Sequence, residues 1–190
     1  KRDMKKFLAG TASRGRGLMR NIILSLCAAT LTSGTGAACG HNPTRPDSRY
    51  VVVDGSDGAE VLDTVSNLIW QRCVVGKTWD AASKQCTGKA RNVGWQVAMT
   101  LGADAPKPAS AGSAWHLPSY MDLLSLLDLA CRNPAVNAKW FADPDILFLW
   151  SGTSYEKLAD YAWGLKYATG DITYDGKNEE FQVRLVRSSR

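Results

Sequence analysis

The sequence lacks the residue spacings that mark a metal site. It has five cysteines but no Cys-x-x-Cys pair, and histidine occurs only at His41 and His116. Structural zinc sites depend on closely spaced cysteine and histidine ligands, so a zinc site is not expected. The acidic stretch 54–58 is too short for an EF-hand loop and is expected to be a solvated turn. We therefore expect no metal and no cofactor.

Long apolar runs and internal repeats are also absent. The apolar stretch 22–29 is too short to span a bilayer. It follows the basic residue Arg20 and precedes the small residues 33–38, which is the pattern of a secretory signal peptide. Cleavage is expected after Ala37 or Ala38.

This pattern predicts three segments. Residues 1–18 are an upstream segment with no assigned structure, and residues 19–38 are the signal peptide. Residues 39–190 form a single domain of ordinary size. The domain is expected to be exported, periplasmic or extracellular, without a transmembrane helix in the mature chain.

The basic charge of the chain belongs to its leader. The formal net charge is +5, from 23 basic and 18 acidic side chains. Residues 1–38 hold seven of the basic side chains and one of the acidic ones, so their removal leaves 16 against 17, a net charge of −1. Bulk charge therefore gives no support to a nucleic-acid partner.

Four cysteines remain after the leader, and an even number in an exported chain predicts two disulfides. Cys73 and Cys86 bracket a short loop, 74–85, and we pair them. This leaves Cys39 with Cys131. Lipidation of Cys39 is the alternative, but the preceding Gly-Ala-Ala lacks the large aliphatic residue that such a signal usually carries.

The stretch 115–129 contains the clearest helix signal. Pro118 disfavours helix before it. Ser119 can cap the helix, and Asp122 stands at the capping-box position. The leucines that follow, up to Leu129, predict a broad apolar stripe.

The fold class predicted from the remaining patterns is α+β, with two helices and an antiparallel sheet. A second helix is expected over 95–101, with Met99 among its core residues. The Asp175-Gly176 dipeptide predicts a hairpin turn. Strands are expected over 50–54, 60–64, 68–72, 148–151, 161–167, 172–174 and 181–186.

Five motifs, in order over about residues 50–187, resemble the Lcl C-terminal domain family, named for the C-terminal domain of the Legionella collagen-like adhesin. They are Val61-Leu62-Asp63-Thr64 with 67–72, Trp115-His116-Leu117-Pro118-Ser119 with 122–124, Trp150-Ser151-Gly152-Thr153, Ala162-Trp163 with Gly170, and Val183-Arg184-Leu185-Val186-Arg187. The resemblance implies a C-type-lectin-like fold and export. In the namesake it implies binding of sulfated glycosaminoglycans.

The chain departs from the family pattern at three positions. His116 replaces an arginine, Gly152 a serine, and Asp122 a glutamate. No collagen-like Gly-x-y repeat precedes the domain. The calcium-ligand motifs of C-type lectins are not reproduced by 133–134 or 143–145, so calcium-dependent sugar binding is not expected.

Candidate ligand-binding residues come from two groups. Trp70, Trp95, Trp115, Trp150 and Trp163 fall within strand or helix patterns and are expected in the core. The candidate contact residues are Trp79, Trp140 and Tyr155, together with a cationic patch of Lys157, Lys166 and Lys177 that would bind sulfates if its loops converge. Acidic residues between these lysines favour a mixed solvated surface instead.

Arg184 and Arg187 are expected to pair with carboxylates, although Arg187 can also be exposed.

These observations predict a recognition domain rather than an enzyme. His116 could act as a general base, but it has no discernible partner and no catalytic residue is assigned. The expected partner is a glycan or an envelope or surface protein, bound in adhesion. One alternative is an enzyme on the related formylglycine-generating scaffold, which by resemblance needs a reactive cysteine pair. Another is a structural subunit of an envelope assembly.

Overall fold

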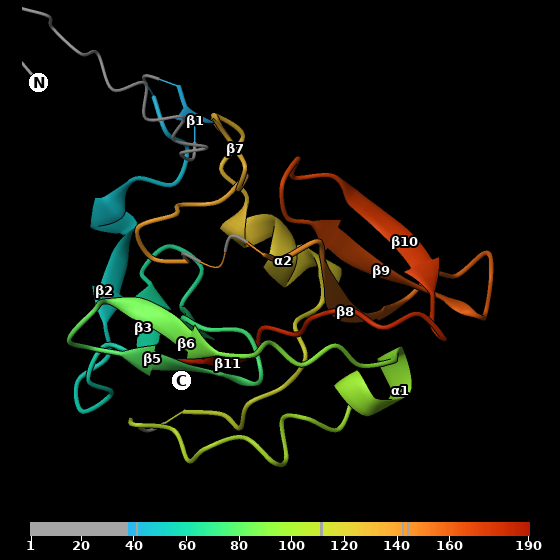
Figure 1. Cartoon of the computed structure of the whole chain (residues 1–190), viewed down its shortest axis with the longest axis horizontal. Coiled ribbons are helices and arrows are strands. Elements are labelled where there is room, and N and C mark those ends of the chain that lie inside the picture. Colours follow the sequence, from blue (N-terminus) through green and yellow to red (C-terminus); the bar gives the residue numbers. More distant parts are fainter. Residues whose placement is uncertain (1–37, 41, 111, 142, 144) are drawn as a thin grey trace, which may run out of the picture. The chain divides into compact units, whose positions relative to one another are not determined.

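The computed structural model (Figure 1) describes residues 38–40, 42–110, 112–141, 143 and 145–190. The predicted upstream segment and almost all of the signal peptide lie outside the described residues. Helices, antiparallel sheets and two disulfides make this part of the chain an α+β structure, as predicted. A membrane-spanning helix is not found among the described residues.

The first sheet has the strand order β11-β4-β3-β2. Its strands are β2 (Tyr50–Val52), β3 (Glu60–Asp63), β4 (Leu68–Gln71) and β11 (Val186–Ser188). The three N-terminal strands confirm the predicted ones. The C-terminal strand was predicted over 181–186, but it is later and shorter, because residues 181 and 182 form isolated bridges with Val93 and Leu149 instead.

The second sheet has the strand order β10-β9-β8, formed by β8 (Phe148–Ser154), β9 (Tyr161–Lys166) and β10 (Ile172–Gly176). Gly164 lets β8 and β9 approach closely, since a Cβ there would lie 2.2 Å from the Phe148 ring. The predicted hairpin turn at Asp175-Gly176 is wrong. Both residues belong to β10, where Gly176 pairs with Tyr161, so the register with β9 outweighs the local turn preference.

Two small two-stranded sheets carry the disulfides. The hairpin of β5 (Lys77–Asp80) and β6 (Gln85–Gly88) overlaps the segment 74–85 that was expected to be a loop, and the Cys73–Cys86 disulfide closes it. The pair of β1 (Ala38–Cys39) and β7 (Cys131–Arg132) holds Cys39–Cys131. Both predicted pairings are confirmed. The disulfide occupies the Cys39 thiol that lipidation would require.

The helix α2 (Tyr120–Leu126) begins with the predicted capping box. The Ser119 side chain accepts a hydrogen bond from the Asp122 amide, and Asp122 accepts one from the Ser119 amide at 2.8 Å. The helix ends earlier than its leucine pattern suggested. Leu127 is extended and Leu129 is 70% exposed, so the predicted contribution of Leu129 to the apolar stripe is wrong.

The other helical elements are short. The helix α1 (Trp95–Ala98) stops before the predicted end at residue 101. Met99 is therefore 47% exposed, and its predicted place in the core is wrong. A 3-10 turn, η1 (Asp47–Arg49), leads into β2.

The helix α2 lies between the two sheets (Figure 1), and its leucines join their apolar faces. Leu123 and Leu126 share one cluster with Val61 and Trp70 of the first sheet and with Leu149 and Leu165 of the second, among others. Among the tryptophans expected in the core, Trp70, Trp115 and Trp150 are buried, whereas Trp95 and Trp163 are only half-buried.

The predicted partners of the two arginines near the C-terminus are present. Arg184 pairs with Asp143 at 2.9 Å and Arg187 with Glu60 at 2.8 Å. Both arginine side chains are fully buried, so exposure of Arg187 is excluded.

Candidate functional site

An aromatic cluster opens to solvent on the second sheet. We call it the tyrosine patch and define it as Tyr120, Tyr155, Tyr161, Trp163 and Tyr174. Tyr161 is 37% exposed and Tyr174 is 40% exposed, while the other three side chains are half-buried. Solvent-exposed aromatic clusters of this kind commonly mark binding surfaces on soluble proteins.

The rings of the tyrosine patch hold one another in place. Tyr155 and Tyr174 stack with ring centroids 4.0 Å apart and an interplanar angle of 7°. Trp163 stands nearly perpendicular to both, at 5.1 Å from Tyr155 and 5.8 Å from Tyr174. Tyr161 presents an edge to Tyr174 at 5.9 Å. Stacked and edge-to-face pairs are the favoured arrangements, so the patch is rigid before any ligand arrives.

The sheet register explains why these rings meet. Tyr174 lies directly opposite Trp163, and Tyr161 is two residues from Trp163 on the same face of β9. Further along this face Leu165 is covered by α2. Tyr120, the first residue of α2, stacks on Trp163 at 5.8 Å. The patch is therefore the part of the core face that extends beyond the start of α2.

Lys177 fastens the turn next to the tyrosine patch. Its Nζ donates hydrogen bonds to Ser154 Oγ at 2.5 Å and to the Ala159 carbonyl at 2.6 Å. The same ammonium lies 4.3 Å from the centre of the Trp95 ring. Lys177 was predicted to be a ligand-binding cation, but its ammonium is engaged by these contacts within the protein. Because Lys177 contacts both Ser154 and Ala159, it holds the segment that contains Tyr155 in place.

The three predicted lysines do not form one cationic patch. Lys157 lies in the turn that Lys177 fastens, whereas Lys166 is at the other end of β9, opposite Phe148. Five residues of extended strand separate the two ends, which is about 17 Å. The segments 154–160 and 175–180, which flank the tyrosine patch, carry five carboxylates against two lysines. The surroundings of the patch are therefore acidic.

Trp79 and Trp140, predicted as stacking platforms, are brought together by Arg72. The Arg72 guanidinium lies 3.5 Å from the centre of the Trp79 ring and 5.2 Å from that of Trp140. It also donates to the Trp140 carbonyl at 3.1 Å and the Lys139 carbonyl at 2.9 Å. Burial, together with the charge of Arg184, lowers the pKa of Arg72 to about 10. One face of each tryptophan ring is therefore already occupied by Arg72.

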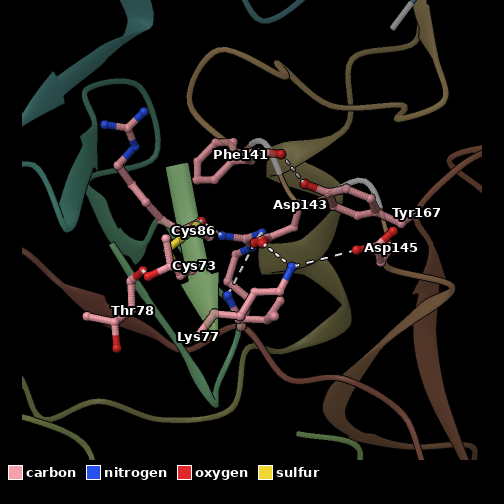
Figure 2. Close-up of polar contacts among 12 residues, drawn as sticks. Cys73, Lys77, Thr78, Cys86, Phe141, Asp143, Asp145 and Tyr167 are labelled. Carbon is pink, nitrogen blue, oxygen red and sulfur yellow. Dashed lines mark hydrogen bonds and ion pairs between the residues drawn. A yellow bond between two sulfur atoms is a disulfide. The ribbon is translucent and has the colours of Figure 1, made fainter. Parts of the chain in front are cut away.

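A buried ionic cluster forms around Asp143 (Figure 2). Asp143 accepts hydrogen bonds from Arg184 at 2.9 Å, from Lys77 Nζ at 3.2 Å and from the Val74 amide at 3.3 Å. Nearby, the Tyr167 hydroxyl donates to the Phe141 carbonyl at 2.6 Å, and burial raises the pKa of Tyr167. These contacts join Lys77, at the start of β5, to Asp143 and to Arg184 of the C-terminal segment, so the cluster links distant parts of the chain.

His116 and the acidic stretch 54–58 were the other candidates for chemistry. His116 is exposed, and its Nδ1 lies 3.2 Å from the Ala114 carbonyl. A hydrogen bond from the ring to a hydroxyl or carboxylate is not found among the described residues. The stretch 54–58 forms a turn, with Asp57 and two glycines at positive φ. Groups of three or more metal-ligating side chains are absent from the described part of the chain.

Sequence reasoning found Tyr155 but missed the rest of the tyrosine patch. Trp163 was expected in the core because its strand reads as apolar. The available signal was the spacing of Tyr161 and Trp163, which puts two aromatic side chains on one face of a strand. Tyr174 could join them only once the register of β10 was known.

Comparison with protein families identifies the family of this chain's main domain. The family model of the Lcl C-terminal domain matches residues 59–187. No curated protein and no solved structure matches the chain. The C-type-lectin-like fold that the resemblance implies therefore stays a prediction, while the α+β class is established.

Proposed function

The chain belongs to the Lcl C-terminal domain family, and from this membership and the geometry of its surface we propose that it is an exported, non-enzymatic domain that recognises a glycan in surface adhesion. The observation that carries the proposal is the tyrosine patch. It is the exposed surface where rigid aromatic side chains gather, and the family resemblance implies recognition rather than catalysis.

Tyrosine suits this task for a physical reason. Its ring offers apolar area while its hydroxyl can donate and accept hydrogen bonds, and it has few rotatable bonds to order on binding. A sugar ring has an apolar face of C–H groups and a rim of hydroxyls. The exposed rings of Tyr161 and Tyr174 can contact the face, and their hydroxyls can reach the rim.

The charge around the patch favours an uncharged glycan. The two flanking segments, 154–160 and 175–180, carry an excess of carboxylates, and the ammonium of Lys177 donates to Ser154 and Ala159. An acidic surface repels sulfate groups and slows their approach. We therefore expect neutral oligosaccharides to bind better than heparin, in contrast to the sulfated ligands of the family's namesake.

A glycan array at physiological salt, with heparin included, tests the proposal. Tyr161→Ala and Tyr174→Ala should each weaken binding of the selected glycan roughly tenfold or more, as expected for aromatic contact residues. Val65→Ala is the matched control, since Val65 is 69% exposed in the β3–β4 turn. Binding of a neutral glycan should change little with salt, because exposed charges contribute little to it.

Two outcomes would contradict the proposal. One is an array with no bound glycan. The other is a bound glycan whose affinity is the same in Tyr161→Ala, Tyr174→Ala and Val65→Ala. Preference for heparin, lost on substitution of Lys157, Lys166 and Lys177 by alanine, would instead favour the cationic surface that acidic neighbours argue against.

The cysteines support a binding role over the formylglycine-generating alternative. That chemistry needs a reactive cysteine pair, and all four cysteines of residues 39–190 are in disulfides. Disulfides also agree with an oxidising compartment outside the cytoplasm. Thiol titration of the native, non-reduced mature protein should detect no reactive thiol, and two reactive thiols would revive the enzyme.

A further inference from the structure

We propose that a cavity beside Trp79 is a second binding site, which takes a free amino acid with an apolar side chain. The cavity has a volume of about 390 Å³ and lies between the β5–β6 hairpin and the segment 101–106. This volume falls within the range of small-molecule sites. The cavity shares no lining residue with the tyrosine patch, so the inference does not depend on glycan binding.

The floor of the cavity is apolar. It is lined by Val75, Leu101, Trp115 and Leu185, and the last three side chains are buried in the second core cluster. An apolar side chain of a ligand bound here would move from water to an apolar surface that is already formed. Such burial stabilises by roughly 25 cal/mol per Å² of apolar area.

The side chains that form the walls are held in place by residues outside the cavity. Arg72 stacks on Trp79 at 3.5 Å, and Asp143 holds the Lys77 ammonium at 3.2 Å, as Figure 2 shows for Lys77. The Glu60 carboxylate accepts from Arg187 at 2.8 Å and from the Ala109 amide at 2.8 Å. Because these groups are fixed without a ligand, binding costs little reorganisation.

Gly76 allows the start of the β5–β6 hairpin to lie close to residues 89–91. Its φ is +94°, and a Cβ at this position would lie 2.6 Å from the Lys89 carbonyl. The main chain is tied at the same point by the Arg91 amide, which donates to the Val75 carbonyl at 2.9 Å. These contacts fix the start of the hairpin, which forms one side of the cavity, against residues 89–91.

Four polar side chains of the lining are left free. Gln71, Thr78, Arg91 and Asp104 have no side-chain hydrogen bond or ion pair with any other described residue, whereas the charges of Glu60 and Lys77 are already paired. The lining thus offers one cation, one anion, one amide and one hydroxyl. Arg91 and Asp104 are both exposed at the mouth.

This combination selects a zwitterion. A ligand with a carboxylate alone would meet the uncompensated charge of Asp104, and a ligand with an amine alone would meet that of Arg91. A free amino acid satisfies both charges at the rim, with its carboxylate toward Arg91 and its ammonium toward Asp104. Its side chain then points to the floor formed by Leu101, Trp115 and Leu185.

Isothermal titration of the purified protein with L-leucine and L-phenylalanine tests the inference. Glycine, which lacks the apolar side chain, should bind more weakly than either. Arg91→Gln and Asp104→Asn should each weaken binding of L-leucine roughly tenfold, because each removes a charge-assisted hydrogen bond. Arg190→Gln and Asp54→Asn are matched controls at exposed positions outside the cavity.

Two leucine derivatives assign each charge to its partner. L-leucinamide lacks the carboxylate, so Arg91→Gln should leave its weaker binding unchanged. N-acetyl-L-leucine lacks the ammonium, so Asp104→Asn should leave its binding unchanged. Absence of heat with both amino acids overturns the inference, and so does equal binding of L-leucine by Arg91→Gln, Asp104→Asn and the controls. Tyr161→Ala and Tyr174→Ala should not affect this titration, which separates it from glycan binding.

Discussion

Asp143 shows how a single side chain can hold distant parts of this chain together. Its carboxylate pairs with Arg184, which is fully buried, and with Lys77 at the start of β5. Arg184 also donates to the main-chain carbonyls of Gln71 and Arg72. Both cations therefore depend on Asp143, and its loss leaves the buried charge of Arg184 uncompensated.

Asp143→Ala should lower the free energy of unfolding by about 3–5 kcal/mol, the usual cost of removing one partner from a buried ion pair. Urea unfolding followed by circular dichroism measures it. Asp145→Ala is the matched control: Asp145 is 86% exposed and lies 4.0 Å from Lys77, so its removal should cost less than about 1 kcal/mol. Equal losses in the two variants would show that Asp143 does not hold the cluster.

Asp63 makes the free energy of unfolding depend on pH in the acidic range. Burial raises the pKa of this carboxyl, but hydrogen bonds from Arg49 and Ser66 outweigh burial and hold the pKa below its ordinary value. A depressed pKa contributes stability above the unfolded pKa of about 3.9. That stability is lost as the pH falls through the lower folded pKa.

Asp63→Asn should therefore flatten the fall in unfolding free energy below about pH 4. Urea titrations at successive pH values measure the slope. Asp57→Asn, at an exposed turn position with φ of 50°, should keep the wild-type slope. An unchanged acid slope in Asp63→Asn would mean that this carboxyl does not govern the acid sensitivity.

At the scale of elements, α2 depends on its N-terminal cap. The helix has seven residues, and two of the hydrogen bonds between Ser119 and Asp122 satisfy main-chain amides at its N-terminus that have no partner within the helix. Ser119→Ala should cost about 1 kcal/mol in unfolding free energy. Ser189→Ala, near the C-terminus, should cost almost nothing. If the two variants unfold alike, the cap does not stabilise α2.

The elements also show what sequence could predict. The capping box was predictable because Ser119 and Asp122 act within one turn. The β5–β6 hairpin was missed because its strands, Lys77–Asp80 and Gln85–Gly88, show no apolar alternation and are secured by a disulfide and by Arg72. The tyrosine patch and the cavity depend on strand register and on contacts between distant segments, which no local pattern encodes.

At the scale of the whole molecule, the two proposed sites use different parts of the structure. The tyrosine patch is the part of the core face of the second sheet that extends beyond α2, whereas the cavity lies over the first sheet and the β5–β6 hairpin. The buried arginines near the C-terminus connect the walls of the cavity to the core, because Arg187 fixes Glu60 and Arg184 fixes Asp143. Binding at one site is therefore expected to leave the other unchanged.

The two disulfides should contribute unequally to global stability. Cys39–Cys131 spans 92 residues of sequence and Cys73–Cys86 spans 13. In the chain-entropy account the longer loop restricts the unfolded chain more, which predicts about 4–5 kcal/mol for the first and about 3 kcal/mol for the second. Paired serine substitutions, compared by urea unfolding, measure the two contributions.

Local effects should run in the opposite order. Removing Cys73–Cys86 frees the hairpin that carries Trp79, so amide exchange in β5 and β6 should accelerate and binding of L-leucine should weaken. Removing Cys39–Cys131 should accelerate exchange in β1 and β7 and leave L-leucine binding unchanged. A larger global loss from Cys73–Cys86 would show that native contacts of the hairpin, rather than restriction of the unfolded chain, dominate its contribution.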